Sequence, residues 1–499
     1  MNSGGKKNLP PSPPTLPLIG NLHQLGSLPH RALWNLSRKY GPITLLKFGK
    51  QPVLVVSSAD IAKKILKTHD LSFANRSVLI TPKKLLYDFN GLLGSPYGTQ
   101  WRNLRTIFVH ELLSNTKLKS YNSIMEEETG LLVEKIAYKF LTLSTVNLTD
   151  AFKTLTNDMI CRAAFGRRFS ETQQGKEYLE GLKEGEGLVS STLTLGEFIP
   201  CLGWINWLTG FNAARDMYVM KQDKILEAVL EEHLNKGADE SKDNFVDLLL
   251  GIHKGNTPGV DVDRSTVKAL IADVLGAGTK TTSTSLEWVM TELIRHPTVM
   301  KKLQDEIREI MKGKQHITSH DLEKMHYLKA VIKETFRFHP SVVMYPRAAR
   351  EYVNVMGYDI SPETEVLINL WAIGRDPACW QEPEKFIPER FLNSSVDFRG
   401  FDFELIPFGA GRRICPGLEF AATSMEHTLA NLMHKFDWAL PDGARGEDLD
   451  VIEKHGLTIS RKNPLPMKRS NSQSKFKKGP QNLVMGIRLL EECEDLLGS

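Results

Sequence analysis

Cys415 stands in a segment whose composition suits a sulfur that binds a metal. The run from Pro407 to Gly417 reads PFGAGRRICPG, and its glycines allow a tight backbone turn beneath a flat ligand. Arg412 and Arg413 lie within three residues of the sulfur. A helix expected just after the cysteine directs its first N–H groups at the thiolate and favours its negative charge. A lone cysteine is more often an inert apolar residue, but these surroundings predict a metal ligand.

Trp101 and Arg105 offer two hydrogen-bond donors at helical spacing. They lie four residues apart, so one helix face presents an indole N–H and a guanidinium. Two fixed donors suit a carboxylate. Standing alone, the pattern would more often be a half-buried tryptophan beside a solvated arginine.

Glu334 and Arg337 share a second helix face, three residues apart. Taken alone, they would be an everyday surface ion pair. A further arginine, Arg390, follows in the segment Pro388–Phe391, ahead of the cysteine.

The elements that must position these residues are mostly helices. Residues 97–310 show apolar residues at three- and four-residue spacing, which is typical of helices. The longest expected helix runs from Asp263 to His296, where Pro297 stops it, and another follows Cys415 to about Phe436. Short strands are expected near Ile43–Phe48, Val53–Val56 and Val366–Leu370. The sequence predicts one large, mainly α domain with a small β region.

The pattern Phe-x-x-Gly-x-Arg-x-Cys-x-Gly is met at Phe408, Gly411, Arg413, Cys415 and Gly417. With it the chain resembles the cytochrome P450 superfamily over about residues 9–467. The resemblance implies the P450 fold, with haem b between the long oxygen-side helix and the cysteine loop. It makes Cys415 the axial ligand of the haem iron, where thiolate donation favours O–O cleavage.

The resemblance also assigns roles to the other motifs. Cofactor binding is implied for Trp101, Arg105, Arg347, Phe408 and Arg413, with the arginines and the indole on the haem propionates. A structural role beneath the haem is implied for Glu334, Arg337 and Arg390.

On the oxygen side, the segment Ala277–Thr282 reads AGTKTT where the family has Ala/Gly-Gly-x-Asp/Glu-Thr-Thr/Ser. The resemblance implies that Ala277 and Gly278 leave room for O2 and that the Thr281 hydroxyl helps to deliver protons. Lys280 replaces the usual acid, and an ammonium with a reference pKa near 10.4 is a poor proton relay. We expect Asp273, on roughly the same face, to pair with Lys280. We hypothesise weakened oxygen activation, which Lys280→Asp would restore.

Three functions remain open. The leading one is a monooxygenase that inserts one oxygen atom from O2 and draws electrons from NADPH through a separate flavoprotein, NADPH-cytochrome reductase. A basic face meeting an acidic reductase is the expected arrangement. The rivals are a haem-thiolate isomerase or dehydratase, and a haem-binding protein without turnover.

Composition excludes several other classes. The net charge of +4 is too small to argue for nucleic acid. Five scattered cysteines without a CxxC pair disfavour a disulfide framework or a zinc site. We expect a lead and Pro-rich hinge over 1–27, the catalytic domain over 28–467, and a basic tail over 468–499 that is disordered or a short helix.

Segments such as Phe73–Arg76 and Ala372–Pro377 resemble the plant A-type group, near its seventy-one family. This implies a small hydrophobic substrate of terpenoid, coumarin, alkaloid or phenolic type, and the cytosolic face of the endoplasmic reticulum membrane. The family's anchor helix is absent from this sequence, which predicts either a truncated chain or a weaker contact with the membrane surface. Substrate contacts are expected from the loop before Trp101 and from Val189–Trp207, Ala269–Ala277, Val342–Met344 and Gly456–Leu457.

Overall fold

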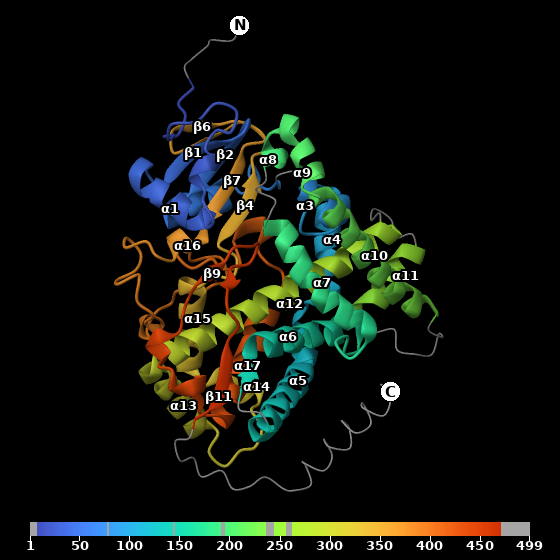
Figure 1. Ribbon diagram of the computed structural model, residues 1–499, viewed down its shortest axis with the longest axis vertical. Helices are drawn as coiled ribbons and strands as arrows, with labels where there is room; N and C mark the ends of the chain where they lie inside the picture. The colour runs from blue at the N-terminus through green and yellow to red at the C-terminus, as the bar shows by residue number, and fades with distance from the viewer. Residues whose placement is uncertain are drawn as a thin grey trace.

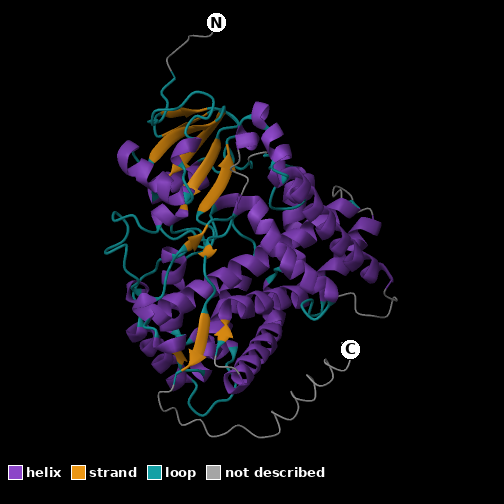
Figure 2. Ribbon diagram, in the orientation of Figure 1, coloured by secondary structure: helices purple, strands orange, loops and turns teal. Residues whose placement is uncertain are grey.

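The computed structural model describes residues 7–76, 79–142, 145–190, 195–235, 244–255 and 262–470. Helices make up most of it, and the main sheet lies at one end, near the N-terminal residues (Figure 2). The mainly α architecture with a small β region is confirmed. Within these ranges, no helix is long and apolar enough to cross a membrane. Residues 1–6 of the expected lead, 191–194 of an expected substrate-contact segment and 471–499 of the expected tail lie outside the described residues.

Seventeen α-helices fall within the described ranges. They are α1 Pro29–Tyr40, α2 Ala59–Lys63, α3 Ile80–Leu85, α4 Thr99–Ile107, α5 Asn115–Thr142, α6 Leu148–Phe165, α7 Gln173–Ser190, α8 Leu195–Phe198, α9 Trp204–Leu208, α10 Phe211–Asn235, α11 Phe245–Gly255, α12 Arg264–Arg295, α13 Pro297–Ile310, α14 Ser319–Glu323, α15 His326–Phe338, α16 Leu370–Ile373 and α17 Leu418–Lys435.

The main sheet has four strands in the order β1-β2-β7-β4, with bounds Ile43–Phe48, Gln51–Val56, Glu365–Asn369 and Met344–Ala348. β2 and β7 run parallel and the other neighbours antiparallel. The three strands expected from the sequence are therefore confirmed to within two residues. The smaller strands are β3 Val146–Asn147, β5 Val353–Val355, β6 Tyr358–Ile360, β8 Trp438–Ala439, β9 Glu453–Lys454, β10 Ser460–Arg461 and β11 Pro466–Arg469.

The long helix α12 crosses the middle of the molecule and packs against α6, α15 and α17 (Figure 1). Asp263 caps it by accepting a hydrogen bond from the Thr266 N–H, and the helix ends at Arg295, just before Pro297. The predicted bounds are thus confirmed to within a residue. Most of its residues are buried, so α12 forms the centre of the core.

A buried ion-pair network joins α15 to the chain ahead of the cysteine loop. Arg337 Nε lies 2.6 Å from Glu334 Oε2, and both side chains are fully buried. Arg337 also donates to three backbone carbonyls, and Arg390 Nε lies 3.2 Å from the Glu334 carboxylate. The structure therefore joins the three residues. Because Glu334 and Arg337 are buried, removal of either one would leave an uncompensated charge inside the protein.

The last described strand, β11, pairs with β3 on one side and β8 on the other. It includes Lys468 and Arg469, which we had expected to begin the basic tail. Folded structure thus continues two residues beyond the expected boundary, because the strand needs them for its pairing with Trp438 and Ala439.

Candidate active site

Two glycines shape the loop that presents Cys415. Gly409 and Gly411 both have φ of +71°, the left-handed region that favours glycine. A Cβ atom would lie 2.3 Å from the Tyr345 ring at Gly409 and 2.4 Å from a backbone oxygen at Gly411. The chain can turn here only without side chains. The turn lets the Cys415 N–H donate to the Phe408 carbonyl oxygen at 2.9 Å.

The Cys415 sulfur lies at the start of α17, as the sequence predicted. Burial raises the pKa of its thiol, while a hydrogen bond from the Gly417 backbone and the charge of Arg105 act to lower it. A metal ion at the sulfur would remove the proton outright. The thiol is unpaired with any other cysteine in the described residues, which leaves it available as a ligand.

Four arginines from four segments gather beside this loop: Arg76, Arg105, Arg347 and Arg413. Arg347 and Arg413 are only 0% and 5% exposed. Within the described residues, none of the four has a carboxylate at ion-pair distance; Arg105 and Arg413 donate instead to backbone carbonyls. We call these residues the arginine cradle. It is a concentration of positive charge, buried at Arg347 and Arg413 and partly buried at Arg76 and Arg105, with no carboxylate counter-ion among the described residues.

The electrostatics of the arginine cradle indicate the ligand that it suits. Burial first, and then the neighbouring guanidiniums, lower the pKa of Arg413 to about 9 and that of Arg76 to about 10. Nε and Nη1 of Arg347 are buried and make no hydrogen bond within the described structure. Charged donors of this kind match carboxylates. The cradle therefore fits the two propionates of a haem whose iron binds Cys415.

Trp101 lies beside the arginine cradle. Its indole N–H donates to the Leu92 carbonyl oxygen at 3.0 Å, and so is already engaged. Its ring lies under the Arg413 guanidinium, 4.7 Å from the ring centroid, and 5.5 Å from that of Arg105. Trp101 thus supports two cradle arginines by cation–π contact.

Sequence reasoning missed Arg76. Its guanidinium donates to the Pro346 carbonyl oxygen and lies 5.4 Å from the centroid of the Tyr345 ring. It reaches the cradle because the preceding residues, Ala74 and Asn75, form β-bridges with Ala348. No local spacing links the two segments, so only their pairing in space reveals the residue.

Phe408 anchors the cysteine loop to the helical core. Its ring packs edge-on against Phe336 of α15 at 5.2 Å and against Phe398 at 5.5 Å. The loop is therefore held on α15, the helix that also carries the Glu334–Arg337 pair.

Near its middle, α12 exposes one turn. Ala277 is exposed and Thr281 is partly exposed, whereas most residues of α12 are buried. The Thr281 hydroxyl donates to the Ala277 carbonyl oxygen at 2.7 Å. Gly278 faces away from this opening, because a Cβ there would lie 2.6 Å from Ile160 of α6. In this structure Gly278 therefore allows close helix packing.

The predicted pairing of Asp273 with Lys280 is wrong. Lys280 Nζ lies 2.5 Å from Glu186 Oε1 on α7. Asp273 Oδ2 instead accepts the N–H groups of Leu92 and Leu93 at 2.6 and 3.0 Å. The loop around Leu92 covers Asp273, so the Lys280 side chain meets its partner on another helix.

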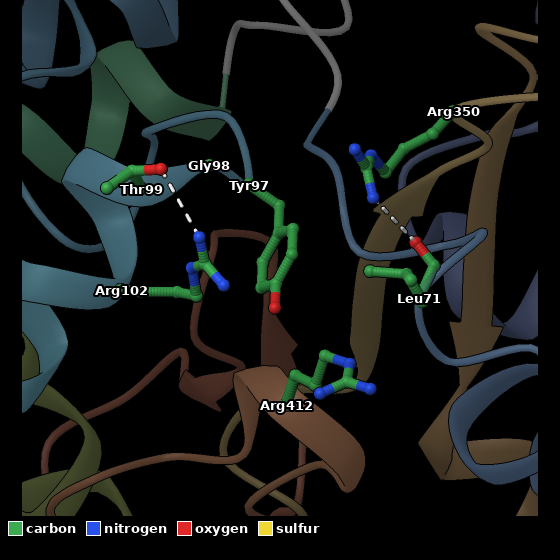
Figure 3. Close-up of a pocket in the computed structure, with 7 residues that line it drawn as sticks. All are labelled: Leu71, Tyr97, Gly98, Thr99, Arg102, Arg350 and Arg412. Carbon is green, nitrogen blue, oxygen red and sulfur yellow. Dashed lines mark hydrogen bonds between the residues drawn. The ribbon is translucent and has the colours of Figure 1, made fainter.

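A second group of arginines lines a cavity of about 430 Å³ next to the cysteine loop (Figure 3). Arg412 reaches it from the loop, Arg102 from α4, and Arg350 from the residues after β4. Arg412 pairs with Asp70 at 3.3 Å. Arg102 donates to the Thr99 hydroxyl, and Arg350 donates to the Leu71 carbonyl oxygen and lies 5.3 Å from the centroid of the Tyr97 ring. Neither arginine has a carboxylate at ion-pair distance in the described part of the chain, so this surface is positive.

A family model for cytochrome P450 matches residues 10–465. The chain belongs to the cytochrome P450 family. It is 50% identical over 465 residues to cytochrome P450 71A8 of Mentha piperita, covering 92% of this chain and 90% of that one. It is 46% identical over 472 residues to the tabersonine/lochnericine 19-hydroxylase of Catharanthus roseus (93% of both chains) and to the norfluorocurarine oxidase of Strychnos sp (92% of both).

A zebra fish cytochrome P450, solved with abiraterone, has the same fold. It superposes with a TM-score of 0.76 at 24% identity, over 90% of this chain and all of that one. The 499-residue chain is therefore a haem-dependent monooxygenase, and its cofactor is haem b. NADPH supplies electrons in this family through a reductase.

Asp273 makes a pH-dependent contribution to stability. Burial raises the pKa of its carboxyl from 3.8 to about 7, against the two backbone hydrogen bonds that lower it. Because the folded state holds this proton more tightly, the contribution of Asp273 to the free energy of unfolding falls as pH rises from about 4 to 7, by roughly 1.4 kcal/mol per unit. We expect Asp273→Asn, whose amide oxygen still accepts both N–H groups, to remove this slope. Urea unfolding across that pH range measures it; an unchanged slope would contradict the assignment.

Proposed function

We propose that this P450 inserts one oxygen atom from O2 into a small, mostly apolar plant secondary metabolite of terpenoid, coumarin, alkaloid or phenolic type. The observation that carries the proposal is the arginine cradle beside Cys415, a buried cationic site that a haem dianion completes. Two relatives support the substrate class, because they are named for oxidising norfluorocurarine and for hydroxylating tabersonine or lochnericine.

The chain's own residues divide the work. Cys415 would hold the haem iron, and Arg76, Arg105, Arg347 and Arg413 the propionates. When bound, the haem supplies oxygen activation, which thiolate donation favours. Thr281 sits on the open turn of α12, where its hydroxyl can hold a proton and pass it on after leaving the Ala277 carbonyl. Lys280 takes no part in that transfer while Glu186 holds it.

The retained Thr281 favours the monooxygenase over an isomerase or dehydratase, since those reactions need no proton delivered to O2. A haem-binding protein without turnover would also keep the arginine cradle. Turnover with isotopic oxygen therefore tests directly whether this chain carries out the monooxygenation that its family membership indicates.

The test uses the full chain loaded with haem, a plant NADPH-cytochrome reductase, NADPH, isotopically heavy O2 and a panel of plant metabolites. We expect a product that carries one heavy oxygen atom and that requires NADPH. Cys415→Ser removes the thiolate ligand and should abolish this product, since a hydroxyl is a far weaker donor to iron. Mass spectrometry reads the outcome. Product formed equally without NADPH would favour the isomerase, and haem binding without any product would favour the inactive protein.

We infer that the arginine-lined cavity of Figure 3 lies on the surface that receives the reductase. Arg102, Arg350 and Arg412 point around one space beside the cysteine loop, and the first two have no carboxylate partner among the described residues. Acidic side chains of a partner would complete them, which favours fast encounter and correct orientation.

Replacing Arg102 and Arg350 together by Glu should slow haem reduction by the reductase about tenfold or more at low salt. The rates of wild type and variant should converge as salt rises, because exposed charges are screened. Stopped-flow absorbance measures the rate. Arg38→Glu, on α1, changes another exposed arginine and should have little effect; an equal loss there would refute a local docking surface.

We also propose that α9 and the start of α10 contact the endoplasmic reticulum membrane. Large apolar side chains gather there at high exposure: Trp204 58%, Trp207 74%, Leu208 63%, Met217 53% and Met220 66%. Exposed large apolar side chains grouped on neighbouring helices favour an interaction surface. Tryptophan in particular suits the boundary between headgroups and acyl chains.

Trp204→Ser with Trp207→Ser should lower binding to phospholipid vesicles by more than about tenfold, because each ring loses burial of roughly 1.5–3 kcal/mol. Co-sedimentation of the full chain with the vesicles measures it. Phe401→Ser is the matched control, since Phe401 is 79% exposed but outside the patch. Equal vesicle binding by the double variant and wild type would overturn the proposal.

A further inference from the structure

Glu186 joins three segments through a single carboxylate. Its Oε1 lies 2.5 Å from Lys280 Nζ on α12, and its Oε2 lies 3.4 Å from Lys454 Nζ on β9. The side chains of Glu186 and Lys280 are 19% and 13% exposed, whereas that of Lys454 is 50% exposed. The Glu186–Lys280 contact is therefore the stronger of the two, since a partly buried pair is less screened by water and salt.

The helix that carries Glu186 is weak on its own. α7 spans Gln173–Ser190 and contains four glycines, at positions 175, 181, 185 and 187. Each costs a helix interior up to about 1 kcal/mol relative to alanine. Two of them flank Glu186 directly. Contacts with other elements must therefore hold α7 in place. Gly181 and Gly185 let it pack closely on α10, where a Cβ would lie 2.4 Å from Gln222 and 2.6 Å from Tyr218, and Glu186 joins it to α12.

The three joined segments include regions expected to surround the substrate. α12 carries the open turn at Ala277 and Thr281. α7 begins the chain segment that leads to α9, and β9 forms a hairpin with β10 whose turn holds Gly456 and Leu457. The contact that fixes α7 to α12 and β9 therefore lies beside the open turn, because Lys280 directly precedes Thr281.

We propose that Glu186 is a clamp that holds α7 closed over the open turn of α12, and that Lys280 replaces the family acid because it is the counter-ion of this clamp. The inference deepens the proposed monooxygenase function and rests on it for the identity of the enclosed site. Opening the Glu186–Lys280 pair admits the substrate, and closing it excludes water. Glu186 and Lys280 are positioning residues and touch no reacting atom.

The clamp reverses our expectation for Lys280→Asp. That change would place an aspartate on α12 opposite Glu186 on α7. The two carboxylates would repel each other, so we expect α7 to move away from α12 and activity not to be restored. The informative variant exchanges the charges, Lys280→Glu with Glu186→Lys, and adds Lys454→Gln to avoid a new repulsion. It returns the acid to α12 and keeps the ion pair.

The test follows binding of phenylimidazole to the haem-loaded full chain by stopped-flow absorbance. We expect Glu186→Gln and Lys280→Met to raise both the association and dissociation rates about tenfold. This is more than the loss of an exposed ion pair would cause and less than the loss of a fully buried one. The dissociation constant should change much less. Hydrogen exchange of the α7 amides should quicken in both variants, while that of α6 stays unchanged.

Glu184→Gln is the matched control. Glu184 lies on the same helix but pairs with Lys221 of α10 at 3.5 Å, with both side chains about half exposed. We expect less than about twofold change in either rate. The charge-exchanged variant should return both rates to nearly the wild-type values.

The clamp is overturned if Glu186→Gln and Lys280→Met leave both rates within about twofold of wild type. It is also overturned if Glu184→Gln matches their effect. These readouts require haem but no turnover, so they still report on the clamp if the monooxygenase proposal fails. A failure of that proposal would appear separately, as absence of an oxygenated product from every variant.

Discussion

The uncompensated charge of the arginine cradle constrains the rest of this structure. Burying guanidiniums is costly unless an anion pairs with them. Here Arg76, Arg105, Arg347 and Arg413 come from four distant segments. Among the described residues they contact backbone oxygens, the Tyr345 hydroxyl and aromatic rings, and no carboxylate lies at ion-pair distance. The protein can keep them together because a ligand with two carboxylates stabilises the folded state when it binds. Binding of the cofactor should therefore raise the stability of this region, and its loss should lower it.

A single loop connects this cradle with the oxygen-side helix. Asp273 of α12 accepts the N–H groups of Leu92 and Leu93, and the Leu92 carbonyl accepts the indole N–H of Trp101. A few residues on, the Ser95 carbonyl accepts a hydrogen bond from Arg413. A displacement of α12 would thus be transmitted through this loop to Trp101 and to Arg413 of the arginine cradle. The two faces of the site share one hydrogen-bonded frame, which explains why a buried carboxyl is tolerated on α12.

The sequence was sufficient wherever the determining pattern is local. The bounds of α12, the turn at Gly409 and Gly411, and the Glu334–Arg337 spacing depend on residues near each other in the chain. Arg76 could not be found in this way, because only β-bridges to Ala348 bring it to the cradle. Nor could the partner of Lys280, since Glu186 lies on a helix whose placement depends on tertiary packing.

The departure of Lys280 from the family pattern cannot be interpreted without its partner, Glu186. Considered alone, the lysine removes an acid and predicts a defect. Beside Glu186, however, Lys280 is one partner of an ion pair in which α12 carries the positive charge and α7 the negative charge. An acid on α12 would reverse this arrangement. The ion pair can join α7 to α12 whichever of the two helices carries the carboxylate. Proton transfer on the oxygen side, in contrast, requires the acid on α12. The same pair can therefore preserve closure while withdrawing an acid from the oxygen side, leaving Thr281 and water to carry protons there.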